Sequence, residues 1–343
     1  MSKNTIEFAN FICHFGSFNL LDRFSEVIYP SIFESTYTRQ YGKTSYFLYK
    51  PELVKLSDDD EALAIVGRFV KMETLEREQR FDGQYLVSDY AELENAPSSI
   101  FALLLRNHRL IYLKENRGSP GVDTFGTTME SFFKNEQKKY IKKNLELFKE
   151  LEPRSRIEIR NERSRLEEYC PVPEVSVVSL VKSDGDIGDF INSFEKIESL
   201  ALKVVKLNDE IDAGALFQSI RKASSGLEVQ SASLTFKDSK GVVTETAKEL
   251  IEGAIEDQNV QFSISGKDRT GGKLSRKNED VNFRISLDDE VFSIKQAARA
   301  MYRKFQALLN NNIFRAPVMR DEGVIQGKLN EIKIRYYPPE DIN

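Results

Sequence analysis

The sequence predicts an α+β protein of two domains, in which a mainly-β domain closed by a long helix precedes an α/β sandwich of ferredoxin-like type. Three observations predict this class. Aromatic and β-branched residues fill short alternating runs in the first third of the chain, one long amphipathic segment follows, and strand and helix patterns then alternate. At 343 residues the chain is also too long to fold around one ordinary hydrophobic core, which favours two domains.

Short apolar runs place the strands of the first domain. We expect strands over residues 4–13, 43–50 and 62–71, and a hairpin of 101–105 with 110–113. The sequence RGSPG then ends this β region, and Thr124 is suited to cap the helix that follows. The domain is therefore expected to be a curved sheet or a small barrel that the helix closes.

A long amphipathic helix and a basic tail end the first domain. Apolar residues within 125–151 recur at three- and four-residue steps, while Lys134, Lys138 and Lys142 fall four apart on another face. The tail PRSRIEIRNERSR follows, and residues 134–165 hold 11 basic against 6 acidic side chains in a chain of net charge −5. Such a local concentration of positive charge indicates an anionic partner.

The sequence PVP marks the start of the second domain, so we assign residues 1–165 and 171–311 to the two domains. Short hairpins mixed with the helices favour a ferredoxin-like sandwich over a doubly wound sheet. Residues 312–343 form an extension whose last strand, 331–337, is a candidate to return to the first domain. In the second domain, strands are expected at 174–182, 200–207, 226–237, 260–266 and 281–287, and helices at 184–195, 209–223, 244–255 and 293–309, the last closing the second sheet.

A basic loop is expected between the strands at 260 and 281. Residues 266–277 hold five basic side chains against one acidic, and Gly271-Gly272 makes the loop flexible. Contact with a phosphate backbone would release counterions and strengthen binding, whereas the alternative is a solvated turn that aids solubility. The first candidate cluster for nucleic-acid binding is Lys267, Arg269, Lys273, Arg276 and Lys277.

The long helix and its tail supply a second cluster. Arg156, Arg160 and Arg163 would share a face of a helix, whereas the alternation in RIEIR would place Arg156 and Arg160 on one side of a strand. Ion pairs with nearby glutamates are the alternative role, and each is worth little at a surface. The second candidate cluster for nucleic-acid binding is Lys138, Lys142, Arg154, Arg156, Arg160 and Arg163.

No catalytic residue, metal ligand or cofactor site is predicted. The two histidines, His14 and His108, have no partner at metal-ligand spacing, and His108 is expected at a polar hairpin tip. The acidic run DDDE after Ser57 is expected to be a turn. Asp280 and Asp288 flank an expected strand, which keeps a metal-dependent nuclease as an alternative function.

Three stretches resemble a known family in their order of elements. SSGLEVQSASLTFKDSKGVVTE joins a small-residue turn, an alternating strand and a hairpin, AARAMYRKFQALL closes the domain as a helix, and SSIFALLLRNHRLIYLKENRGSPGVDTFGTTMESFF joins a hairpin to a helix start. The chain thereby resembles the RexA-like phage exclusion proteins, and its layout is similar to that of the DNA-binding subunit of the Kiwa defence system. The resemblance implies a bacterial antiphage role, a homodimer and sequence-tolerant DNA binding.

The composition is typical of a cytoplasmic protein. Two cysteines are too few for a disulfide framework, the apolar runs are shorter than a membrane span, and the first residues lack the pattern of a signal peptide. We therefore expect a homodimeric antiphage defence protein that binds duplex DNA without catalysis. The nuclease, and a structural subunit that binds another defence protein, are the alternatives.

Overall fold

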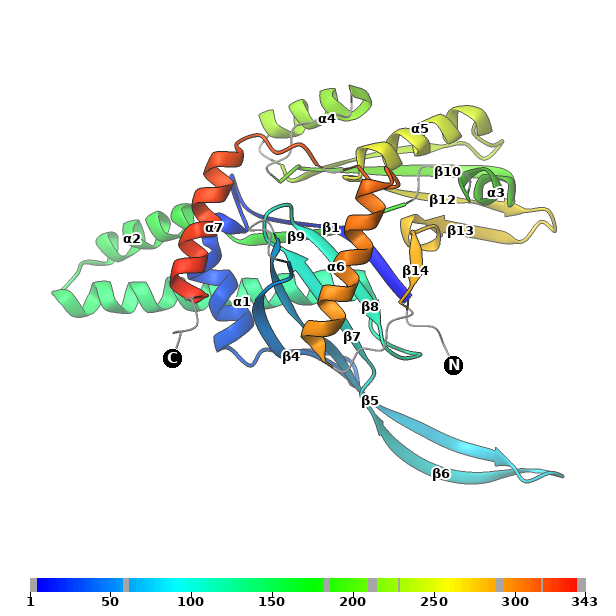
Figure 1. Ribbon diagram of the computed structural model, residues 1–343, viewed down its shortest axis with the longest axis horizontal. Coiled ribbons are helices and arrows are strands. Elements are labelled where there is room, and N and C mark those ends of the chain that lie inside the picture. The colour runs from blue at the N-terminus through cyan, green and yellow to red at the C-terminus, as the bar shows by residue number, and fades with distance from the viewer. Residues whose placement is uncertain are drawn as a thin grey trace.

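The computed structural model describes residues 5–57, 62–181, 186–208, 215–227, 229–287, 293–315 and 317–337. It confirms the α+β class, with a large curled antiparallel sheet in the N-terminal part followed by a long helix. A smaller, four-stranded antiparallel sheet lies beside the large one, with helices on its far side (Figure 1). The described part of the chain contains no helix that is long and apolar enough to cross a membrane.

The large sheet has ten strands, and its main order is β14-β1-β8-β7-β5-β4-β3. Strands β2 and β9 also pair with β1, and β6 pairs with β5. Three short helical turns, Leu21–Arg23, Phe24–Ile28 and Pro30–Glu34, follow β2. The strands are β1 (Thr5–Phe15), β2 (Phe18–Asn19), β3 (Thr38–Tyr41), β4 (Thr44–Lys55), β5 (Leu63–Phe81), β6 (Leu86–Asn95), β7 (Ser98–Leu104), β8 (Arg109–Lys114), β9 (Pro173–Ser179) and β14 (Arg284–Ser286).

Both faces of the large sheet are covered, which explains why its central strands are buried almost throughout. On one face, Phe11 and Phe101 pack under helix α1 (Val122–Leu151). Helix α7 (Glu322–Tyr336) joins the same core and packs on the helical turns that follow β2. On the other face, Phe8 packs under helix α6 (Ile294–Asn310). Because successive residues of a strand point to opposite faces, each central strand must be apolar at nearly every position.

The smaller sheet has the order β11-β10-β12-β13 and carries its helices on one face. Ile251 of α5 and Phe217 of α4 pack there against Leu200 and Ile264 of the sheet. This module therefore has a core of its own. Its elements are α3 (Asp186–Asn192), β10 (Phe194–Val205), α4 (Ala215–Gly226), β11 (Ser231–Lys237), α5 (Thr244–Asp257), β12 (Val260–Asp268), β13 (Lys273–Lys277) and the short turn Asn278–Asp280.

Several elements expected in the second domain belong to the large sheet instead. Strand β9 pairs with β1, β14 pairs with the other end of β1, and α6 packs on the large sheet. Residues 171–311 therefore contribute elements to both sheets. An amphipathic pattern shows that a helix buries one face, but it does not show which sheet that face packs on.

The extension does return to the first domain, but as helix α7, so the strand expected at 331–337 is wrong. Ile325, Leu329 and Ile332 are buried at four- and three-residue steps. The alternation in EIKIRYY resembles a strand, yet Ile332 and Tyr336 also continue the helical spacing, and Ile334 is left exposed.

The arginine-rich tail is helix α2 (Arg156–Tyr169), which settles the choice between helix and strand. The Ser155 hydroxyl accepts from the Glu158 amide at 3.2 Å, and the Ser155 amide donates to the Glu158 carboxylate at 2.8 Å. This capping box begins the helix. Leu166 of α2 then packs on Ile141 and Leu145 of α1, and together the two helices project from one end of the molecule (Figure 1).

Candidate nucleic-acid interface

The side of the smaller sheet opposite its helices carries lysines and small polar residues. Leu200, Leu202 and Ile264 point towards the helices, so the alternate residues of each strand point to the opposite side. We call that side the serine–lysine face. It comprises Ser199, Ala201 and Lys203 of β10, Ser231, Ser233, Thr235 and Lys237 of β11, Gln261, Ser263, Ser265 and Lys267 of β12, and Lys273, Ser275 and Lys277 of β13.

The strand register distributes the lysines among short side chains. Lys267 lies directly opposite Lys273, and Lys203 lies between Ser233 and Gln261. Lys203, Lys237, Lys267 and Lys273 form no ion pair with any residue that the structure describes. Like charges directly opposite each other on a sheet are destabilising, so this arrangement is one that a bound anion would stabilise.

Four carboxylates that border the face have partners of their own. Asp123 of α1 lies 3.7 Å from Lys277, and Glu198 lies 3.7 Å from Lys196. Asp268 accepts from the Gly272 amide at 2.9 Å, and Asp280 accepts from the Lys277 amide at 2.8 Å, one at each end of β13. None of these four acids forms an ion pair with Lys203, Lys237, Lys267 or Lys273.

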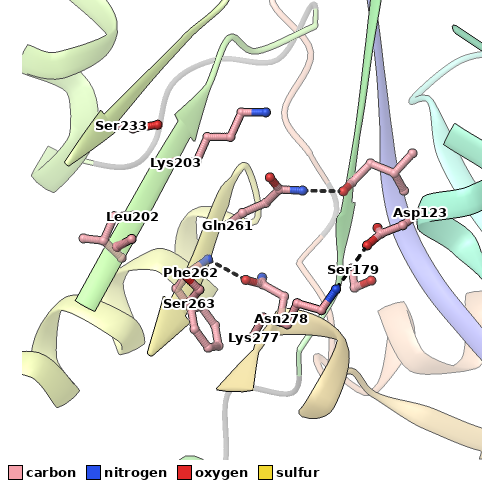
Figure 2. A pocket seen from close by; sticks show the side chains of 12 residues that line it. Asp123, Ser179, Leu202, Lys203, Ser233, Gln261, Phe262, Ser263, Lys277 and Asn278 are labelled. Carbon is pink, nitrogen blue, oxygen red and sulfur yellow. Dashed lines mark hydrogen bonds and ion pairs between the residues drawn. The ribbon is translucent and has the colours of Figure 1, made fainter. Parts of the chain in front are cut away.

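Two clefts lie between the serine–lysine face and the first domain, and Lys203 lines both. The first has a volume of about 240 Å³ and lies beside Asp123, Ser179 and Lys277 (Figure 2). The second has about 320 Å³ and extends past Lys203 towards His14. Burial in the first cleft raises the pKa of Asp123, and Lys277 partly opposes this shift. The clefts accept small groups, whereas the outer rows of the face lie open to solvent.

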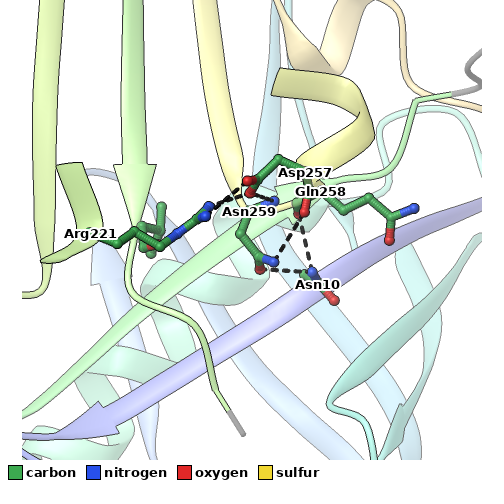
Figure 3. Close-up of polar contacts among 6 residues, drawn as sticks. Asn10, Arg221, Asp257, Gln258 and Asn259 are labelled. Atoms are coloured by element: carbon green, nitrogen blue, oxygen red, sulfur yellow. Dashed lines mark hydrogen bonds and ion pairs between the residues drawn. The ribbon is translucent and has the colours of Figure 1, made fainter. Parts of the chain in front are cut away.

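Polar contacts hold the face in place relative to the first domain. The Gln261 side chain donates to the Val177 carbonyl at 2.7 Å (Figure 2). On the same side of the molecule, the Asn10 side chain donates to the Asn259 side chain at 2.9 Å and to the Gln258 carbonyl at 3.1 Å (Figure 3). Asn10 is completely buried, so these bonds anchor the smaller sheet to β1 of the large one.

The first cluster predicted from the sequence is divided by the strand geometry. Lys267, Lys273 and Lys277 lie on the serine–lysine face, whereas Arg276 alternates with them and shares the side of Leu274, which packs on the helix-covered core. Arg269 lies in the turn and donates to the Asn192 carbonyl at 3.4 Å. The sequence predicts a flexible loop over residues 266–277, and this prediction is wrong for most of the segment. Its second half is strand β13, and within 266–277 only the turn around Gly271, with φ +78°, is irregular.

The second predicted cluster lies at the other end of the molecule, on α1 and α2 (Figure 1). Arg154 is held between Glu152 at 2.9 Å and Glu158 at 3.6 Å, with its guanidinium 4.6 Å from the Phe148 ring. Lys142 has only a distant pairing with Glu146 at 3.9 Å. The remaining members, Lys138, Arg156, Arg160 and Arg163, are exposed and form no ion pair within the described ranges. The structure therefore does not bring the two clusters together.

Sequence reasoning missed Lys203 and Lys237. Both occupy strands in which serine or threonine alternates with apolar residues, as in SASLTFK, where Lys237 shares its side with Ser231, Ser233 and Thr235. That alternation was a usable signal, but it identifies an interface only when four such strands lie side by side.

The residues considered for catalysis do not form a site. His108 is buried at the β7–β8 turn rather than exposed, and burial lowers the pKa of both His108 and His14 to about 4. Asp280 caps a turn, while Asp288 and the acidic run after Ser57 lie outside the described residues. Within the ranges that the structure covers, no three His, Cys, Asp or Glu side chains are grouped to hold a metal.

A scan of the chain against models of known protein families and a search of curated proteins both found no match.

Proposed function

We propose that this protein binds duplex DNA through its phosphate backbone, in a sequence-tolerant manner and without catalysis, as a homodimer that acts in bacterial antiphage defence. The observation that carries the DNA part is the serine–lysine face, which holds Lys203, Lys237, Lys267 and Lys273 on one side of a sheet, in no ion pair with a described residue. The defence role and the homodimer rest on the resemblance of the sequence to phage exclusion proteins.

The composition of the face favours backbone contact over base readout. Proteins that bind single strands stack bases on aromatic rings, and the serine–lysine face has none; Phe236 alternates with its members and lies on the other side. Lysine binds phosphate as a point charge and serine hydroxyls add hydrogen bonds, but neither set distinguishes bases without entering a groove. Duplexes of different sequence should therefore bind with similar affinity.

The test is the salt dependence of duplex binding by Lys267→Gln/Lys273→Gln, followed by fluorescence anisotropy on a labelled duplex. Each lost phosphate contact lowers the slope of log affinity against log salt by about 0.9, so the slope should fall by roughly two units. The matched control is Lys222→Gln/Lys248→Gln, which removes the same charge from the helix side of the module. Equal slopes in the two variants, or no binding by the parent at low salt, would remove this proposal.

The defence role is tested separately in cells. Phage should plate with lower efficiency on a host that produces the parent protein than on one that produces Lys267→Gln/Lys273→Gln at equal abundance. Equal plating efficiency on both hosts would show that the defence role does not depend on DNA binding by these two lysines.

A further inference from the structure

Strands β5 and β6 form an arm that leaves the body of the protein. Strand β5 pairs with β4 as far as Met72 and with β7 as far as Val70, and beyond these residues it pairs with β6 alone. The resulting two-stranded ribbon, residues 72–95, projects from the end of the molecule opposite α2 (Figure 1). We call this ribbon the arm.

One face of the arm is apolar and open. Leu75 lies directly opposite Leu93, and Phe81 lies opposite Leu86, so these four side chains share a face. They remain 45%, 65%, 65% and 71% exposed, in that order. A two-stranded ribbon is marginally stable alone, and a group of exposed large apolar residues marks a surface for a protein partner.

The arm is also strongly acidic. Residues 72–95 contain seven acidic against two basic side chains. Both arginines are committed within the arm, because Arg77 and Arg80 lie 2.7 Å and 3.1 Å from Asp89. A surface of this charge repels nucleic acid and anionic lipid, so its partner must be a protein surface that is both apolar and basic.

The opposite end of the same chain has that character. At the end of α1 and the start of α2, Leu147, Leu151 and Ile157 are 51%, 78% and 67% exposed. Around them the two helices carry basic residues that pair with no acid among the residues described. We call this surface the helical end; its unpaired basic residues are Lys138, Lys143, Lys149, Arg156, Arg160 and Arg163.

We propose that the arm of one copy docks on the helical end of a second copy, and that this contact forms the homodimer. The arm and the helical end lie at opposite ends of the long axis (Figure 1). Two copies placed side by side in antiparallel orientation therefore bring each arm to the other copy's helices, which gives two equivalent contacts and a closed pair. Opposite charge steers the two surfaces together, and the exposed leucines and Phe81 supply the apolar area.

This inference deepens the homodimer of the proposed function and assigns the second basic cluster to dimerisation instead of DNA. It leaves the serine–lysine face of each copy outside the contact. Duplex binding and dimerisation are thus measured separately, and either can fail without the other.

The experiment is a charge exchange followed by sedimentation velocity. The arm variant is Glu76→Lys/Glu92→Lys/Glu94→Lys, and the helical variant is Lys143→Glu/Arg156→Glu/Arg160→Glu. Each should be monomeric alone, because every contact then sets like charge against like. An equimolar mixture should form a heterodimer, because one contact joins the two changed surfaces and the other joins the two unchanged ones.

The control is Glu245→Lys/Glu249→Lys/Glu256→Lys on α5, which makes the same charge change away from both surfaces and should remain dimeric. A parent protein that is monomeric at tens of micromolar would overturn the inference. So would a helical variant that stays dimeric alone, since that result indicates contact between two arms. A mixture that stays monomeric overturns it as well. A parent protein that forms the dimer but binds no duplex in the anisotropy assay would count only against the proposed function.

Discussion

Burial determines what the two histidines can do at the scale of single residues. His14 lies on β1 and His108 in the β7–β8 turn, and both are at least 96% removed from solvent. His108 has φ +55°, a left-handed conformation that disfavours most side chains, and neither of its ring nitrogens has a hydrogen-bond partner among the described residues. Both imidazoles are therefore neutral in the folded protein at neutral pH.

This burial predicts a loss of stability in mild acid. The pKa of each imidazole is about 4 when folded and 6.5 when unfolded, so the unfolded chain binds the proton more tightly. Stability is fully present above pH 6.5 and falls as the pH drops from 6.5 towards 4. Between pH 7 and pH 5 each histidine should cost about 2 kcal/mol of the free energy of unfolding.

Urea denaturation of the parent and of His108→Asn at the two pH values measures this loss. Asparagine tolerates the left-handed conformation and does not titrate, so the variant should lose about 2 kcal/mol less than the parent between pH 7 and pH 5. An identical loss in both proteins would show that His108 is not the group responsible.

At the scale of elements, helix α6 packs on a different sheet from the one that the sequence predicts. Its Met301 and Phe305 lie against the large sheet, and the Phe305 ring is 5.7 Å from that of Phe8 on β1. The helix thus covers the face of the large sheet that α1 leaves open. Its loss would expose that face, not the smaller sheet.

We expect Phe305→Ala to lower the free energy of unfolding by roughly 3–5 kcal/mol, because the ring is 1% exposed and its removal leaves a cavity. Phe236→Ala is the matched control. That ring lies on the edge strand β11 and is 44% exposed, so its removal should cost under about 1 kcal/mol. Chemical denaturation of both variants gives the comparison, and equal costs would contradict the packing described for α6.

At the scale of the whole molecule, the chain passes from the first domain to the smaller module and then returns to the first domain. The first domain is completed by β9, β14, α6 and α7, all of which follow residue 165. The smaller module, by contrast, is continuous from α3 to the end of β13 and has its own core.

The two parts should therefore differ when they are expressed alone. A fragment of residues 180–283 should unfold cooperatively on heating, as followed by circular dichroism, because it retains every element of its core. A fragment of residues 1–165 should not, because the face of the sheet under α6 would be bare. Cooperative unfolding of the 1–165 fragment would show that the later elements add little to this domain.

Much of the element order follows from local patterns. The residue spacing in β1, the β7–β8 hairpin, α1, α5 and α6 predicts each element, because one period dominates each segment. The excess of positive charge on α1 and α2 is also visible in composition alone. Where two periods fit, as in α7, the pattern is ambiguous, and packing against the helical turns that follow β2 selects the helix.

The sequence by itself determined the α+β class, the long helix and the two basic clusters, since these depend on residues close together in the chain. Only the tertiary structure decided that β9 and α6 join the large sheet, that Lys203 and Lys237 share a face with Lys267 and Lys273, and that the basic clusters lie apart. The physical reason is that strand pairing and helix packing join residues distant in the chain. Local periodicity shows that a face is buried or charged, but the surface that meets it depends on the fold of the whole chain.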